Sequence, residues 1–104
     1  MYDMTQLVPR YFKIKLKNNK IIEVEPPKIK ILKKIMKLGS TTESNVSDED
    51  FDNIVLATSM ALSKNKQNYN VSVGWLTENH NIDELYDMLN HYFVWVNEIN
   101  NAKN

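Results

Sequence analysis

The stretch "WLTENHNIDELYDMLNHYFVWV", residues 75–96, places aromatic and aliphatic side chains at intervals of three and four residues. This spacing puts them on one face of an α-helix. We therefore predict a helix over residues 82–100, capped by Asn81 and carrying Asp83 and Glu84 in its first turn, where the helix dipole favours negative charge. The predicted apolar stripe consists of Ile82, Leu85, Tyr86, Leu89, Tyr92, Phe93 and Val96.

Three further apolar residues, Met88, Trp95 and Ile99, widen this stripe on one flank to about half of the helix circumference. A helix that packs on a single neighbour needs a narrower stripe. Either a second element of the chain covers Trp95 and Met88, or a partner protein does.

Two segments upstream complete the helical part of the chain. Residues 71–78 predict a short helix or turn with Val73, Trp75 and Leu76 facing inward. Residues 48–63 predict a helix with an acidic first turn. Its apolar residues fall on two sides, because Leu56 and Met60 lie away from the main apolar face. A central position in a bundle would explain this pattern.

The segment "YFKIKLKNNKIIEVE", residues 11–25, alternates apolar and charged residues on both sides of an Asn-Asn turn. Period two is the pattern of a half-buried strand, and asparagine tolerates the positive φ of a tight turn. We predict a two-stranded β-hairpin. Because a lone hairpin is marginal in water, it must pack on the helices.

Pro26 and Pro27 end the hairpin and are well placed to begin a helix over residues 28–38, with Gly39 as its C-terminal cap. One half of this helix is apolar. The other half carries a basic stripe of Lys30, Lys33, Lys34 and Lys37.

The predicted fold is a single domain over residues 1–104 of the α+β class, mainly α, in which a two-stranded hairpin precedes a bundle of three to four helices. The chain contains no cysteine, which fits a reducing cytoplasm. The first residues lack the pattern of a signal peptide, and no apolar run is long enough to span a membrane.

The zero net charge of the chain conceals a division between its two parts. Residues 1–40 hold ten basic and three acidic residues, a net charge of +7, while residues 41–104 hold three basic and ten acidic residues, a net charge of −7. The two parts can neutralise one another within one molecule, or can join neighbouring copies head to tail.

No motif predicts catalysis, a cofactor or a metal site. Asp48, Asp50 and Asp52 match the start of a calcium loop, but Asn53 and Ser59 stand where that loop needs its glycine and its bidentate glutamate. Helix capping explains these acids better.

The remaining chemical motifs are also incomplete. His80 and His91 have no third ligand at a matching interval, so we expect both to be solvated rather than to bind metal. With only Gly39 and Gly74 in the chain, a phosphate-binding glycine loop is excluded. We expect the protein not to be an enzyme.

The basic stripe leaves one alternative open, a small nucleic-acid-binding or regulatory protein that contacts phosphates through residues 28–38. Three features weigh against it: the helix has no arginine, the second part of the chain is acidic, and the connection to the next helix is too long for a helix-turn-helix turn. A solvated face is the simpler interpretation.

Taken in order, the hairpin, the leading helix, the middle helix "FDNIVLATSMALSKN" and the closing segment "VGWLTENHNIDELYDMLNHYFVWVNEI" resemble the tail assembly chaperones of tailed phages and prophages of low-GC bacteria. The likeness covers most of the chain. In that family the closing segment commonly has a Trp-Leu pair, an acidic helix start and an apolar helix.

The resemblance implies a non-catalytic function in the host cytoplasm. Such proteins bind the tape measure protein or the tail tube protein and keep it soluble before the tail polymerises. A wide apolar face suits this function, because an amphipathic client helix can dock in a groove. The residues expected to face the client or a second copy are Trp75, Leu76, Met88, Trp95 and Ile99.

Overall fold

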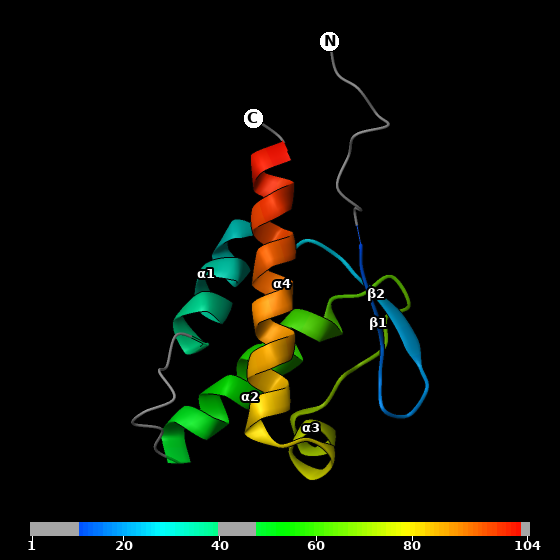
Figure 1. Cartoon of the computed structure of the whole chain (residues 1–104), viewed down its shortest axis with the longest axis vertical. Coiled ribbons are helices and arrows are strands. Elements are labelled where there is room, and N and C mark those ends of the chain that lie inside the picture. The colour runs from blue at the N-terminus through cyan, green and yellow to red at the C-terminus, as the bar shows by residue number, and fades with distance from the viewer. Residues whose placement is uncertain (1–10, 40–47, 103–104) are drawn as a thin grey trace.

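The computed structural model describes residues 11–39 and 48–102, with side chains to residue 99. Two strands, β1 (Phe12–Lys15) and β2 (Ile21–Val24), precede four helices. These are α1 (Ile29–Leu38), α2 (Asp48–Ser63), α3 (Val73–Asn79) and α4 (Ile82–Ala102). The order confirms the predicted α+β class with mainly helical content. In Figure 1, α4 stands between α1 on one side and the hairpin on the other.

The hairpin has the predicted alternation. β1 and β2 pair antiparallel with Phe12 opposite Val24 and Ile14 opposite Ile22, so these four side chains share the face that points toward the helices. Asn19 has a φ of 67°, the positive value that the Asn-Asn turn was predicted to need. Lys13 lies opposite Glu23 on the outer face.

Helix α2 is central, as its two-sided apolar pattern predicted. It packs against α1, α3, α4 and β2. Its buried side chains are Ile54, Val55, Ala57, Thr58, Ala61 and Leu62. The prediction fails for Leu56, which remains exposed because no described element covers that side of the helix.

The hairpin covers the flank of α4 that the sequence left open. The Phe12 ring lies 5.6 Å from that of Trp95 and 6.2 Å from that of Tyr92, measured between ring centroids. Trp95 is 6% exposed and Tyr92 is fully buried. An element of the same chain therefore buries the Trp95 side chain.

Two helix boundaries differ from the sequence prediction. Pro26 and Pro27 lie in the connection between β2 and α1, and α1 begins at Ile29 after an extended Lys28. A helical conformation is disfavoured at Pro26 because Pro27 follows it, and at Lys28 the chain is still extended. At the other end, α4 continues to Ala102, beyond the predicted residue 100.

Tyr92 supplies a test of the core. Its buried hydroxyl has no hydrogen-bond partner among the described residues, and burial raises the pKa of the phenol. An unsatisfied buried hydroxyl costs stability, so Tyr92→Phe should raise the free energy of unfolding by about 1 kcal/mol in urea denaturation.

Tyr69→Phe is the matched control, because the Tyr69 hydroxyl accepts a hydrogen bond from Asn18 Nδ2 at 2.9 Å. This variant should gain no stability. A loss of more than about 1 kcal/mol in Tyr92→Phe would mean that the Tyr92 hydroxyl has a partner.

Candidate binding surfaces

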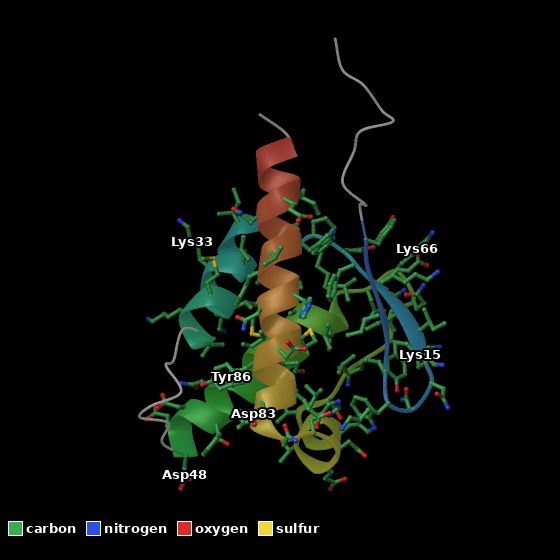
Figure 2. The ribbon with its side chains drawn as sticks, viewed as in Figure 1. Lys15, Lys33, Asp48, Lys66, Asp83 and Tyr86 are labelled. Atoms are coloured by element: carbon green, nitrogen blue, oxygen red, sulfur yellow. The ribbon has the colours of Figure 1, made fainter. Side chains whose placement is uncertain are left out.

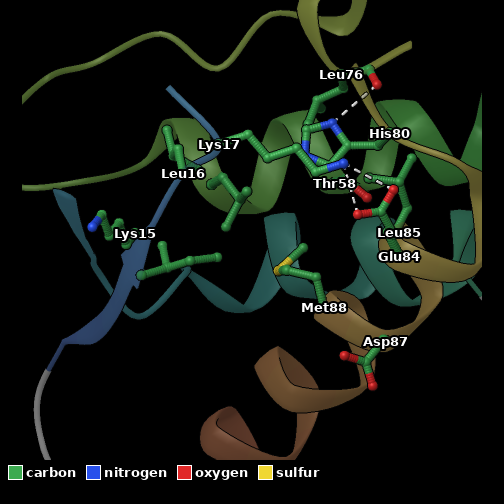
Figure 3. Close-up of a pocket in the computed structure, with 12 residues that line it drawn as sticks. Lys15, Leu16, Lys17, Thr58, Leu76, His80, Glu84, Leu85, Asp87 and Met88 are labelled. Carbon is green, nitrogen blue, oxygen red and sulfur yellow. Dashed lines mark hydrogen bonds and ion pairs between the residues drawn. The ribbon is translucent and has the colours of Figure 1, made fainter. Parts of the chain in front are cut away.

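A groove of about 350 Å³ lies between β1, α2, the end of α3 and the start of α4. Figure 3 shows its lining, with Met88 entering from α4 and Leu16 from the end of β1. The apolar side chains that line it are Ile14, Leu16, Leu62, Leu76, Leu85 and Met88. This volume is at the lower end of the range for binding pockets, about 300–1,000 Å³.

The rim of the groove is charged with opposite signs on its two sides. Lys15 and Lys17 belong to the hairpin side, while Glu84 and Asp87 belong to α4. Lys17 Nζ lies 2.7 Å from Glu84 Oε2 and donates to the Asn79 carbonyl at 2.7 Å. These contacts tie the turn of the hairpin to the junction of α3 and α4, and they close one end of the groove (Figure 3).

Glu84 is held by α4 itself as well as by Lys17. Its Oε1 accepts the Asn81 N–H at 3.0 Å, and Asn81 Oδ1 accepts the Glu84 N–H at 3.0 Å. This reciprocal pair is a capping box, which satisfies two N–H groups at the start of the helix. The Lys17 hydrogen bond first, and the Asn81 backbone hydrogen bond second, hold the pKa of Glu84 below its ordinary value of 4.5.

His80 lies at the same junction. Its Nδ1 is 3.2 Å from the Leu76 carbonyl, and its ring meets the Trp75 ring edge-on with 5.1 Å between centroids. The imidazole is therefore held by contacts at the end of α3, and it lines the groove beside Glu84.

The five residues predicted to bind a partner do not form one surface. Leu76 is 1% exposed and Trp95 is 6% exposed, so both are core residues in this structure. This corrects the expectation that they face a client: the hairpin covers Trp95, and the packing of α3 on α2 buries Leu76. Trp75, Met88 and Ile99 are half-buried, and Met88 lines the groove. Val73, also predicted to face inward, is exposed.

Exposed apolar side chains lie on several elements, and three of them are on α1. Ile29 is 73% exposed, Met36 is 52% exposed and Ile31 is 36% exposed, whereas Ile35 is fully buried. We call Ile29 and Met36 the α1 apolar edge; Ile31, two residues after Ile29, projects toward the opposite side of the helix. Sequence reasoning missed it, although the signal was present: half of the circumference of α1 is apolar, more than packing on α2 alone can bury.

The predicted basic stripe lies beside this edge and is exposed over its whole length, at Lys30, Lys33, Lys34 and Lys37. Figure 2 shows Lys33 pointing outward from α1, away from α4. Lys30, Lys33 and Lys34 form no salt bridge with another described residue. At these three positions the stripe presents its positive charge to solvent.

Within residues 11–39 and 48–99, no three His, Asp or Glu side chains are grouped so that they could hold a metal ion. None of the described helices is long and apolar enough to cross a membrane.

Comparisons of the chain with protein-family models, with curated proteins and with solved structures give no match. The resemblance to tail assembly chaperones therefore stays a prediction.

The Lys17–Glu84 ion pair predicts a pH dependence. Because the pKa of Glu84 is lowered in the folded state, its charge adds stability above the ordinary pKa, and this stability is lost as the pH falls through the lowered value. Glu84→Gln keeps an oxygen that can accept from Asn81 but removes the charge. In urea denaturation the variant should be less stable than the wild type at pH 7 and equal to it in strong acid.

Glu98→Gln is the matched control, because Glu98 is an exposed acid on α4 with no salt bridge to another described residue. It should lower the stability at pH 7 by less than Glu84→Gln does. If Glu84→Gln lowers the free energy of unfolding by the same amount at pH 7 and in strong acid, the ion pair is not the cause of the loss.

Proposed function

We propose that this protein is a non-catalytic tail assembly chaperone that binds an amphipathic helix of the tape measure protein or the tail tube protein in the host cytoplasm before the tail polymerises. The observation that carries this proposal is the α1 apolar edge, where Ile29 and Met36 stay exposed on the same side of one short helix. The hairpin and helices follow one another along the chain as in that family, and this resemblance supports the identity of the client.

The α1 apolar edge has the properties of a docking site for a helix. Ile29 and Met36 are seven residues apart and therefore lie two turns apart on the same side of α1. An amphipathic client helix presents anchors at matching intervals of three, four and seven residues. Met36 suits a client of variable sequence, because a methionine side chain is flexible and polarizable.

The basic stripe determines the charge of the preferred client. Lys33 lies next to the apolar edge on the surface of α1, and the remaining lysines of the stripe extend the positive surface beyond it. A client helix with acidic residues beside its apolar stripe would meet this surface with complementary charge. We therefore expect the client segment to be apolar on one side and acidic next to it.

The double variant Ile29→Gln/Met36→Gln tests this function. Both side chains are exposed and glutamine is a good helix former, so the free energy of unfolding should change by less than about 1 kcal/mol. Co-expression with the tape measure or tail tube protein of the same genome should yield soluble, co-purifying client with the wild type and at least about tenfold less with the double variant.

Leu56→Gln is the matched control, because Leu56 is exposed on α2 and lies outside the α1 apolar edge. It should leave the yield of soluble client unchanged. If the wild type neither co-purifies with either client nor raises its solubility, the protein is not their chaperone.

The exposure of the basic stripe favours one second candidate function, a nucleic-acid-binding protein that contacts phosphates through α1. The two functions differ in their dependence on salt. As a chaperone, the protein should not bind a short DNA duplex in a filter-binding titration even at low salt. Binding that weakens with a slope of several released counterions, and that Lys30→Gln/Lys34→Gln abolishes, would favour the second function.

A further inference from the structure

The two edges of the hairpin differ in their backbone hydrogen bonds. On β2, the Glu25 N–H donates to the Lys64 carbonyl and the Lys66 N–H donates to the Glu23 carbonyl, both at 2.9 Å. Gln67 Oε1 accepts the outward N–H of Glu23 at 2.8 Å. The segment after α2 therefore bonds the outer edge of β2 at Glu23 and Glu25.

No residue of the part of the chain that the structure describes covers the outer edge of β1 in this way. The Leu16 N–H donates to the Lys20 carbonyl, and in an antiparallel pair the residues that bond the partner strand alternate with those that do not. Phe12 and Ile14 therefore bond β2, while the N–H and C=O groups of Lys13 and Lys15 point outward. Among the described residues these outward groups have no hydrogen-bond partner.

This open edge adjoins the groove. The groove is lined by residues 14–17 of the hairpin and by no residue of β2, so it lies on the β1 side of the sheet. In Figure 1, β1 runs between β2 and α4. A strand added to β1 would lie about 4.8 Å from it and would direct alternate side chains toward the apolar lining that Ile14, Leu85 and Met88 provide.

The lysines of β1 determine which side chains the added strand should carry on its other side, away from the groove. Lys13 and Lys15 lie on the outer face of the hairpin, and Lys15 projects outward in Figure 2. Side chains directly opposite on neighbouring strands favour opposite charge and disfavour like charge. A second copy of β1 would place lysines against lysines, so the edge is protected from pairing with itself.

The geometry points to β-strand addition: the outer edge of β1 and the groove bind an extended segment of a partner protein in which apolar residues alternate with acidic residues. The backbone of the segment pairs with Lys13 and Lys15, its apolar side chains enter the groove, and its carboxylates face the lysines. This surface is separate from the α1 apolar edge, and it binds a strand rather than a helix.

The extent of the groove limits the length of the paired segment. On the hairpin the groove reaches from Ile14 to Lys17, where the Lys17–Glu84 ion pair lies, and it does not include Phe12. The segment that pairs is therefore about as long as β1, on the order of four residues.

Peptide titrations of the isotope-labelled full chain, followed by NMR, test this inference. The probe is a short peptide of alternating glutamate and valine; the comparison peptides replace glutamate by lysine, or group the same residues into two blocks. The alternating acidic peptide should bind, shift the amide signals of Lys13 and Lys15, and slow their hydrogen exchange. Both comparison peptides should bind at least about tenfold more weakly, because cross-strand charge pairs and alternation both contribute.

Two variants locate the site. Lys13→Glu/Lys15→Glu reverses the charge of exposed residues and should reverse the preference between the acidic and the basic peptide. Met88→Gln makes the lining of the groove more polar. It should lower the affinity for the acidic peptide by about tenfold, roughly the effect of losing one apolar contact. Lys34→Glu, on α1, is the matched control and should leave the affinity unchanged.

Three results would overturn the inference. The first is an equal affinity for the three peptides. The second is a response confined to the amides of α1 rather than to Lys13 and Lys15. The third is slow exchange of the Lys13 and Lys15 amides that depends on protein concentration without peptide, because a second copy would then occupy the edge. Failure of the client test on the α1 apolar edge leaves this measurement unaffected.

Discussion

The packing of the hairpin against α4 is the constraint on which the rest of the structure depends. A two-stranded hairpin is not stable by itself in water, and α4 has more apolar circumference than the other helices bury. Phe12 joins the two, because its ring packs against Tyr92 and Trp95. This contact anchors the hairpin and covers apolar surface of α4. The Lys17–Glu84 ion pair fixes the other end of the hairpin at the start of α4.

This use of the hairpin determines where the molecule remains open. Helix α2 occupies the centre and contacts α1, α3, α4 and β2. Because the hairpin covers α4, no described element is left to cover the far side of α1, and its apolar edge stays in solvent. The same arrangement leaves the outer edge of β1 beside the groove, while the segment after α2 bonds β2 at Glu23 and Glu25.

Both open surfaces belong to the basic part of the chain. The α1 apolar edge lies beside the exposed basic stripe, and the β1 edge carries Lys13 and Lys15 on its outer face. Each surface combines apolar contact with positive charge, so each favours a partner segment that is apolar and acidic. The difference between them is geometric, because the first suits a helix and the second suits a strand.

The sequence by itself determined the order of the elements and where their apolar faces lie. Alternation in the hairpin, the turn at Asn19 and the Asn81 cap were each predicted, because local spacing and backbone preferences cause them. Tertiary structure alone decided which apolar flank would be covered. Periodicity shows that Trp95 and Ile29 both lie on apolar faces, but it does not identify the neighbour of either face. The contact of Phe12 with Trp95 joins residues far apart in the chain, and it makes Trp95 core while Ile29 stays exposed.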